Sequence, residues 1–150
     1  MHASPIEQPS NEVVLTVTGE IAHTNADNTA VFDMDMLMKM ETVTINTSTI
    51  WTEGVQVFEG VSLHDLFEAL GVAEGTMLAI AINDYKVEIP VSDASVDGPI
   101  IAYKLNGEMM SVRDKGPLWV VYPYDSNPAY RSEVIYSRSI WQLDRLEFVK

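Results

Sequence analysis

Residues 100–123 read "IIAYKLNGEMMSVRDKGPLWVVYP" and contain the strongest local structure signals of the chain. Asn106-Gly107 stands between two apolar segments, the pattern typical of a two-residue β-hairpin turn. It predicts strands over residues 98–105 and 108–112. Gly116-Pro117 then marks a second turn, and the bulky run at 118–123 predicts a buried strand. This stretch therefore indicates a sheet built from short neighbouring strands.

Upstream of this stretch the chain alternates between β-branched and helical patterns. Residues 12–21 and 42–50 are rich in Val and Thr and are predicted to be strands. Residues 31–41 are predicted to form a short helix, because Asp33 can cap it and Met34, Leu37 and Met38 have helical spacing.

Residues 60–72 give the clearest helix prediction. Ser62 is a suitable N-cap, and Gly71 can supply a left-handed C-terminal stop. The apolar residues recur at intervals of three and four, which places them on one helix face: Leu63, Leu66, Phe67 and Leu70.

The remaining segments complete a β-rich pattern. Residues 76–82 and 85–91 are predicted strands joined at Asn83-Asp84, residues 124–134 a loop, and residues 143–150 a closing strand. Many short strands with two short helices predict a single β-rich α+β domain over residues 13–150. Residues 1–12 are small, polar and proline-containing, so we expect a flexible tail.

Composition excludes several classes of function. The net charge is −13, which argues against binding to nucleic acid or to anionic membranes. No stretch approaches the length of a membrane span. The chain has no cysteine, so it has no disulfide, thiolate metal ligand or cysteine nucleophile.

Familiar catalytic and metal-binding patterns are weak or missing. His2, His23 and His64 are scattered and are interpreted as solvated side chains, so no metal site is predicted. No G-x-S-x-G, P-loop or G-x-G-x-x-G segment occurs. The methionines of residues 34–40 fall on two helix faces, which favours packing over copper binding.

The C-terminal third gathers cations and aromatic rings. All four arginines lie there: Arg113, Arg131, Arg138 and Arg145. Several tyrosines and Trp141 accompany them. Guanidinium groups beside aromatic planes suit a flat, polar or anionic heterocycle, although surface ion pairs and core packing explain single residues equally well.

Three segments together resemble the oxidoreductase molybdopterin-binding domain, the sulfite-oxidase fold. They are "FEGVSLHDLFEALGV" (58–72), residues 100–123 above, and "SRSIWQLDRLEF" (137–148). The resemblance covers roughly residues 13–149. It implies a pterin pocket in which Tyr103 matches the family's active-site tyrosine and Arg113 the arginine of its "RD-x-G" turn.

The resemblance also assigns further pocket residues. Arg138 and Ser139 match an Arg-Ser pair near the pterin phosphate, and Trp141 stands where the enzymes often carry lysine. We expect Trp51 or a C-terminal aromatic residue to stack on the ring, and Arg131 to donate hydrogen bonds to it. The predicted ligand-binding set is Trp51, Tyr103, Arg113, Tyr130, Arg131, Arg138, Ser139 and Trp141.

The chain departs from the enzymes at the metal ligand. Thr47, Ser48 and Thr49 stand near the position of the cysteine that ligates molybdenum in the family, and a hydroxyl replaces a thiolate poorly. The chain is similar to a cysteine-less branch of exported proteins that bind free pterins. That resemblance implies a periplasmic, non-catalytic pterin-binding module, without metal, that controls a membrane-bound signalling partner such as a cyclic di-GMP enzyme. The alternatives are a molybdopterin-dependent oxidoreductase and a plain interaction domain.

Overall fold

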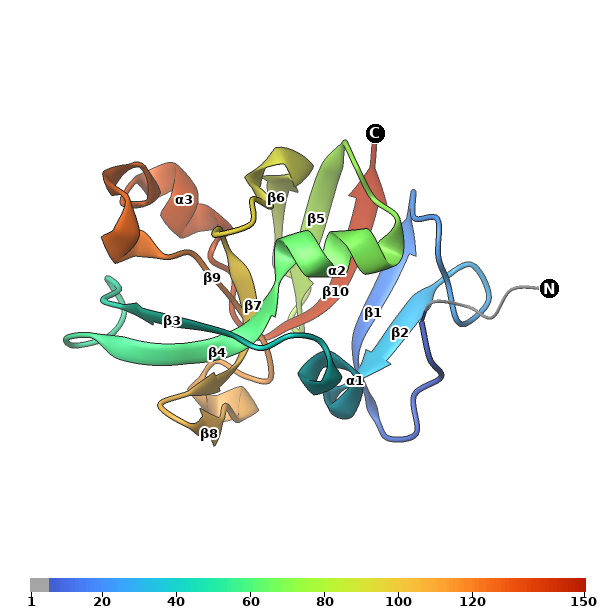
Figure 1. Cartoon of the computed structure of the whole chain (residues 1–150), viewed down its shortest axis with the longest axis horizontal. Coiled ribbons are helices and arrows are strands. Elements are labelled where there is room, and N and C mark those ends of the chain that lie inside the picture. The colour runs from blue at the N-terminus through green and yellow to red at the C-terminus, as the bar shows by residue number, and fades with distance from the viewer. Residues whose placement is uncertain (1–5) are drawn as a thin grey trace.

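The structure is a computed structural model that describes residues 6–150. Two five-stranded β-sheets make up most of this part of the chain, and short helices border them (Figure 1). The first sheet contains β1 (Val13–Gly19), β2 (Ala30–Asp33), β5 (Thr76–Ala81), β6 (Lys86–Pro90) and β10 (Leu143–Val149). The second contains β3 (Val43–Thr47), β4 (Gln56–Ser62), β7 (Ile100–Leu105), β8 (Glu108–Met109) and β9 (Trp119–Val121). The β-rich α+β prediction is confirmed.

Three α-helices and four single turns of 3-10 helix connect the strands within residues 6–150. The α-helices are α1 (Met34–Lys39), α2 (Leu63–Leu70) and α3 (Glu133–Arg138). The 3-10 turns are η1 (Val91–Asp93), η2 (Val112–Asp114), η3 (Tyr124–Ser126) and η4 (Pro128–Tyr130). No helix in this part of the chain has the length and apolar composition of a membrane span.

The first sheet brings the two ends of the domain together. Its strand order is β2-β1-β10-β5-β6, and β1 pairs in parallel with β10. Helix α2 covers this sheet, with the rings of Phe67 and Phe148 5.1 Å apart in an edge-to-face contact. The expected caps of α2 are confirmed: Ser62 Oγ accepts a hydrogen bond from Asp65 N at 3.0 Å, and Gly71 adopts φ 73°.

The second sheet is built around residues 100–123. Its order is β3-β4-β7-β8, and β9 pairs with the other end of β7, on the same side as β8 and opposite β4. Asn106 and Gly107 have φ values of 54° and 86°, as the predicted hairpin turn requires. Trp119 is fully buried, which confirms the prediction of a buried strand there.

Several segments differ from the sequence predictions. Of the strand predicted at 108–112, only Glu108–Met109 pairs with β7, and residue 112 begins η2. The helix expected at 31–41 begins only at Met34, because Ala30–Asp33 pairs with β1 as strand β2 and Asp33 caps the helix. Strand β4 was not predicted: Gly60 weakens its β pattern, yet a Cβ there would lie 2.0 Å from the Ile101 carbonyl oxygen. Tight strand packing therefore requires this glycine.

A further difference is helix α3 (Glu133–Arg138), whose first two residues fall within the loop predicted at 124–134. It is six residues long and buries only Ile135, so no apolar periodicity marks it. Its start is fixed by Ser132, whose Oγ accepts a hydrogen bond from Ile135 N at 3.3 Å.

The N-terminal segment contacts the domain where the structure describes it. Ser10 N and Asn11 N donate to Asp33 Oδ2 at 2.9 and 3.0 Å, and Asn25 Nδ2 donates to the Glu7 carbonyl oxygen at 2.6 Å. Residues 1–5 of the expected tail, including His2, lie outside the described residues.

Candidate functional site

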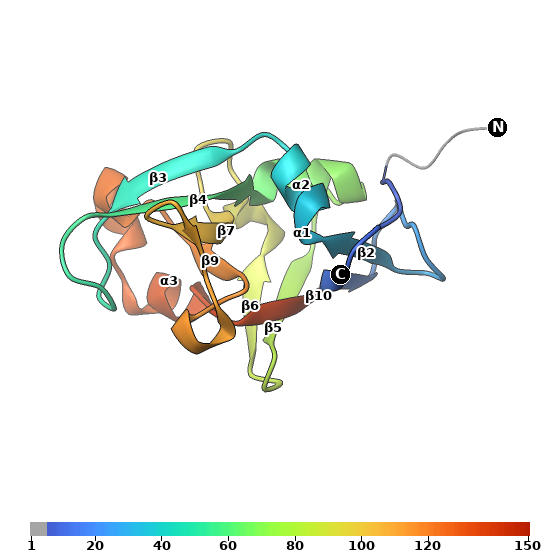
Figure 2. The ribbon, with the colours of Figure 1, turned by 90° about the horizontal axis from the view of Figure 1, so that it is seen from below.

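A pocket of about 340 Å³ lies between the β5–β6 turn, helix α3 and the segment that follows α3. In Figure 2 the β5–β6 turn extends from the lower side of the molecule, with α3 to its left. The residues that line the pocket are all uncharged: Trp51, Ala81, Asn83, Tyr85, Tyr136, Ser137, Ser139, Ile140, Trp141 and Gln142. We call it the aromatic pocket.

Trp51 lies at the centre of a group of aromatic rings. Its ring makes edge-to-face contacts with Trp119, Tyr124, Tyr136 and Trp141, with centroid distances of 5.9, 6.2, 5.8 and 5.5 Å. Such contacts stabilise an aromatic group beyond the area that it buries. The β3–β4 loop therefore presents Trp51 as a fixed wall of the pocket.

Ser139 forms part of a hydrogen-bonded wall behind the pocket. Its Oγ accepts from the Tyr124 hydroxyl at 2.6 Å and donates to the Ile135 carbonyl oxygen at 2.9 Å, while its carbonyl oxygen accepts from Trp119 Nε1 at 3.2 Å. Burial raises the pKa of Tyr124 to about 12, so this hydroxyl remains protonated near neutral pH. These bonds fix the aromatic rings around Ser139.

Two side-chain amides provide polar groups at the pocket. Asn83 Oδ1 accepts from Tyr85 N at 3.2 Å, and Gln142 Nε2 donates to the Val112 carbonyl oxygen at 2.7 Å. Within residues 6–150 the Asn83 amide nitrogen and the Gln142 amide oxygen have no hydrogen-bond partner. One donor and one acceptor thus remain for a ligand.

A second pocket, of about 320 Å³, lies next to Arg113 and is called the Arg113 pocket here. It is lined by Thr52, Leu105, Glu108, Met109, Met110, Arg113, Asp114, Lys115 and Trp119. Lys115 Nζ lies 5.8 Å from the Trp119 ring centroid and 5.4 Å from that of Trp141. Trp119 and Trp141, which we call the tryptophan group, line this pocket and the aromatic pocket respectively. The tryptophan group therefore separates the two pockets.

Arg113 is exposed on η2 and has no hydrogen bond or ion pair to any residue of the described chain. Its guanidinium group is available to a ligand, but Glu108 and Asp114 line the same pocket and offset its charge.

Arg138 instead belongs to a partly buried ion pair. Its Nη1 lies 2.8 Å from Asp93 Oδ2, which also accepts a hydrogen bond from the Tyr122 hydroxyl at 2.8 Å. Burial and then the Asp93 carboxylate raise the pKa of Tyr122 well above its usual value. The guanidinium of Arg138 thus ties α3 to η1, and Arg138 does not line the aromatic pocket.

The other expected residues also lie outside this pocket. Arg131 Nη1 donates to the Tyr124 carbonyl oxygen at 3.1 Å, and the Tyr130 ring lies 5.6 Å from that of Tyr122. Tyr103 is buried in β7, with its hydroxyl 3.2 Å from Thr42 Oγ1. Successive side chains of a strand point to opposite faces of the sheet. Tyr103 therefore lies on the opposite face from its neighbour Ala102, which pairs with Trp119.

Of the residues expected at the site, the structure brings three into the aromatic pocket: Trp51, Ser139 and Trp141. Sequence reasoning missed Asn83, Tyr85, Tyr136 and Gln142. Asn83 and Tyr85 were interpreted as turn and strand residues, and only the fold brings that turn to helix α3. Gln142 adopts φ 55°, which no local pattern indicates.

Thr47, Ser48 and Thr49 lie near the position expected for the metal ligand, and their hydroxyl groups form hydrogen bonds with other residues of the chain. Thr47 Oγ1 accepts from Asp125 N at 3.0 Å, and Ser48 donates from both its N and its Oγ to the Asp125 carboxylate at 2.8 and 2.7 Å. Thr49 Oγ1 lies 2.7 Å from Thr52 Oγ1. These bonds fasten the β3–β4 loop to η3.

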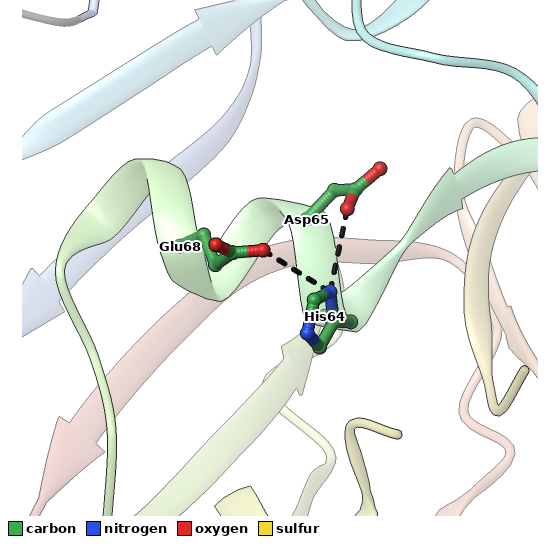
Figure 3. A group of neighbouring side chains, drawn as sticks. All are labelled: His64, Asp65 and Glu68. Carbon is green, nitrogen blue, oxygen red and sulfur yellow. Dashed lines mark hydrogen bonds and ion pairs between the residues drawn. The ribbon is translucent and has the colours of Figure 1, made fainter. Parts of the chain in front are cut away.

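His64 lies in a group of polar side chains on one face of α2. Its Nδ1 lies 3.4 Å from Asp65 Oδ1 and 3.2 Å from Glu68 Oε1 (Figure 3). One ligand atom from each residue lies within 4.8 Å of the others. All three side chains are at least one-third exposed, which agrees with the interpretation of His64 as solvated.

The family was identified by comparison with known proteins. The family model described as the oxidoreductase molybdopterin binding domain matches residues 3–127. The chain belongs to this family. Among solved structures, the fold is similar to the sulfane dehydrogenase SoxCD from Paracoccus pantotrophus, with a TM-score of 0.66 and 16% sequence identity. The match covers 99% of this chain but 39% of that one. No curated protein sequence matches the chain.

The family's cofactor fits this chain only in part. Aromatic walls and two available amide atoms suit a pterin ring in the aromatic pocket. A thiolate-ligated metal does not fit, because the chain has no cysteine and the hydroxyls at residues 47–49 bond to other parts of the protein.

Proposed function

We propose that the chain is a non-catalytic pterin-binding protein whose ligand occupies the aromatic pocket. The observation that carries the proposal is the arrangement of Trp51, Tyr136 and Trp141 around an uncharged cavity of about 340 Å³. Pterin-sized heterocycles bind in pockets of this size that combine apolar walls with a few polar groups. Membership of the molybdopterin-binding family supports the same ligand class.

The pocket supports specific contacts with a pterin ring. Trp51 and Trp141 provide aromatic surfaces, while Asn83 and Gln142 offer a donor and an acceptor to the amide-like edge of the ring. Tyr85 is 59% exposed and lies at the rim, where it can cover a bound ring.

The arginines expected at the site have different places in this proposal. Arg113 is the one that could reach an anionic tail extending past the tryptophan group. Arg138 and Arg131 hold the loops around the pocket through their bonds to Asp93 and Tyr124. Tyr103 and Tyr130 support the surrounding core and loop.

A role in signalling completes the proposal. By resemblance to the cysteine-less branch of the fold, the protein acts in the periplasm and controls a membrane-bound partner, such as a cyclic di-GMP enzyme. Pterin binding would control the partner by favouring one of two conformations of the protein that differ in affinity for that partner. The charge of −13 favours a partner with a basic face.

Titration of the purified protein with oxidised and reduced pterins tests the proposal. We expect quenching of tryptophan fluorescence, because Trp51 and Trp141 line the pocket, and a matching heat signal in calorimetry. No binding at about 100 μM pterin, which corresponds to a modest affinity, would reject the proposal.

A molybdopterin-dependent oxidoreductase is the second candidate, and the family match favours it equally. Elemental analysis of protein purified from its native host separates the two. One molybdenum per chain would establish the oxidoreductase, whereas a pterin recovered without molybdenum would support the binding protein.

A further inference from the structure

We propose that the outer edge of β3 is a docking site for an extended, basic segment of a partner protein, which adds to the second sheet as a further strand. This inference goes beyond the proposed function, because it concerns a different surface and does not require pterin binding. It rests on the sheet edge, on the groove beside that edge, and on the charge of the groove.

Within residues 6–150, strand β3 has a neighbouring strand on one side only, although η3 contacts its C-terminal end through Asp125 N and Thr47 Oγ1. It pairs with β4 over Val43–Thr47 and ends the strand order of its sheet (Figure 1). In an antiparallel strand, alternate backbone groups point away from the partner strand. In the described chain, no hydrogen bond joins the backbone of residues 43–46 to anything other than β4. This edge is therefore open for strand addition.

The other sheet edges within residues 6–150 are protected. Strand β2 is covered by the Asn25 side chain, whose Nδ2 donates to Val31 O and whose Oδ1 accepts from Val31 N, both at 2.8 Å. Strand β6 carries Lys86, Glu88 and Pro90, residues that discourage pairing. Strand β8 has only two residues, and the free edge of β9 is covered by the segment after α3, because Val120 N donates to the Ile140 carbonyl oxygen at 2.9 Å. By contrast, β3 contains neither a charged residue nor proline.

A groove of about 480 Å³ runs beside this edge, and we call it the β3 groove. It is lined by Glu41, Val43, Thr44, Ile45, Asn46, Ser62, His64, Asp65, Val96, Asp97, Gly98, Pro123 and Ser126. The four β3 residues that line it, 43–46, span roughly 13 Å, which is the length of a short extended segment. The peptide-binding mode in which a strand joins a sheet edge needs such a combination.

The negative charge of the β3 groove favours a partner segment that carries basic residues. Glu41, Asp65 and Asp97 line it, and no lysine or arginine of residues 6–150 does. Val96, which is 70% exposed, adds an apolar contact. Side chains of an added strand alternate between its faces, so a segment that alternates basic and apolar residues fits both features.

A second copy of this chain is a poorer occupant. Pairing of two β3 edges would bring the carboxylates of both copies together, and like charges across an interface are unfavourable. The charge thus favours a different, basic protein over self-association.

Binding of a labelled peptide tests the proposal in the absence of any pterin. The probe is a fluorescein-labelled peptide of about six alternating lysine and valine residues, and fluorescence anisotropy measures its affinity. We expect binding at low salt that weakens as salt screens the carboxylates. The same peptide with alternate backbone nitrogens methylated should lose binding, because it cannot form the ladder.

Charge-reversal variants locate the site. Glu41→Lys and Asp97→Lys should each raise the dissociation constant about threefold to tenfold, as expected for single exposed charge pairs reversed in sign. Glu88→Lys, an exposed acidic residue on the edge strand β6, is the matched control and should leave the affinity unchanged.

Four results would overturn the proposal. They are equal binding of a glutamate–valine peptide, equal binding of the methylated peptide, an equal effect of Glu88→Lys, and no binding at about 1 mM peptide. Dimerisation of the protein through β3 in sedimentation experiments would replace the partner by a second copy. None of these results bears on the aromatic pocket, so failure here and failure of the proposed function are distinguishable.

Discussion

At the scale of single residues, Trp51 both packs against the aromatic core and lines the proposed binding site. It contacts four aromatic residues and lines the pocket, although it lies in a connection between two strands. Its position depends on the bonds that fasten the β3–β4 loop to Asp125. One loop residue is thus held by groups distant in the sequence.

Replacement of Trp51 tests the pocket. Trp51→Ala should weaken pterin binding by about fivefold to 150-fold, because loss of a stacking partner costs about 1–3 kcal/mol. Trp51→Phe keeps an aromatic face and should weaken binding less. Calorimetry measures the affinities, and thermal unfolding of both variants shows whether they remain folded. Unchanged affinity in folded Trp51→Ala would place the ligand elsewhere.

Asp93 is the residue on which the Arg138 and Tyr122 contacts converge. Asp93→Ala should lower the free energy of unfolding by about 2 kcal/mol, because a partly buried guanidinium and a buried hydroxyl lose their acceptor. Urea denaturation measures the change. Asp97→Ala, an exposed carboxylate in the same connection, is the control and should change stability little.

At the scale of elements, glycine positions show where strands approach closely. Gly60 lies in β4 against β7, and an added Cβ would meet the Ile101 carbonyl oxygen at 2.0 Å. Gly107, in the β7–β8 turn, has φ 86° and no heavy atom within 4 Å of such a Cβ. The first glycine is required by packing, the second by backbone conformation.

These two glycines predict different costs. Gly60→Ala should destabilise the protein by more than about 3 kcal/mol, because backbone must move to admit the methyl group. Gly107→Ala should cost only about 1 kcal/mol, the strain of a left-handed residue. Denaturation by urea compares them, and equal losses would show that the β4–β7 contact is looser than described.

Local elements were predictable where one strong signal dominated. The cap residues Ser62 and Gly71 and the Asn106-Gly107 turn each act within a few residues, so their sequence pattern was sufficient. Helix α3 and strand β4 were missed because their stability comes from tertiary contacts. The aromatic pocket was only partly predicted for the same reason.

At the scale of the whole molecule, ionisation limits the pH range of stability. Hydrogen bonds from the Met36 backbone lower the pKa of Asp33, and those from Ser48 lower the pKa of Asp125. A carboxyl group with a lowered folded pKa stabilises the protein above its unfolded pKa, and this contribution disappears as pH falls. At the alkaline end, burial raises the pKa of Tyr124 to about 12.

The pH dependence of thermal stability follows from these signs. A tyrosine with a raised folded pKa stabilises the protein below its unfolded pKa near 10, and this contribution declines as pH rises from there through about 12. We therefore expect the melting temperature to fall below about pH 4 and above about pH 10. Circular dichroism measures it. Tyr124→Phe should show a smaller alkaline decline, and an identical decline would contradict this role of Tyr124.

The sequence by itself determined the hairpins, the capped helix α2, the acidic surface, the absence of cysteine and the resemblance to the molybdopterin-binding family. Each depends on composition or on residues close together in the chain. Only the tertiary structure decided which residues share a pocket. It joined Trp51 to Trp141 and the β5–β6 turn to α3, paired Arg138 with Asp93, and left one edge of β3 open. Those outcomes depend on sheet order and side-chain packing, which no local pattern encodes.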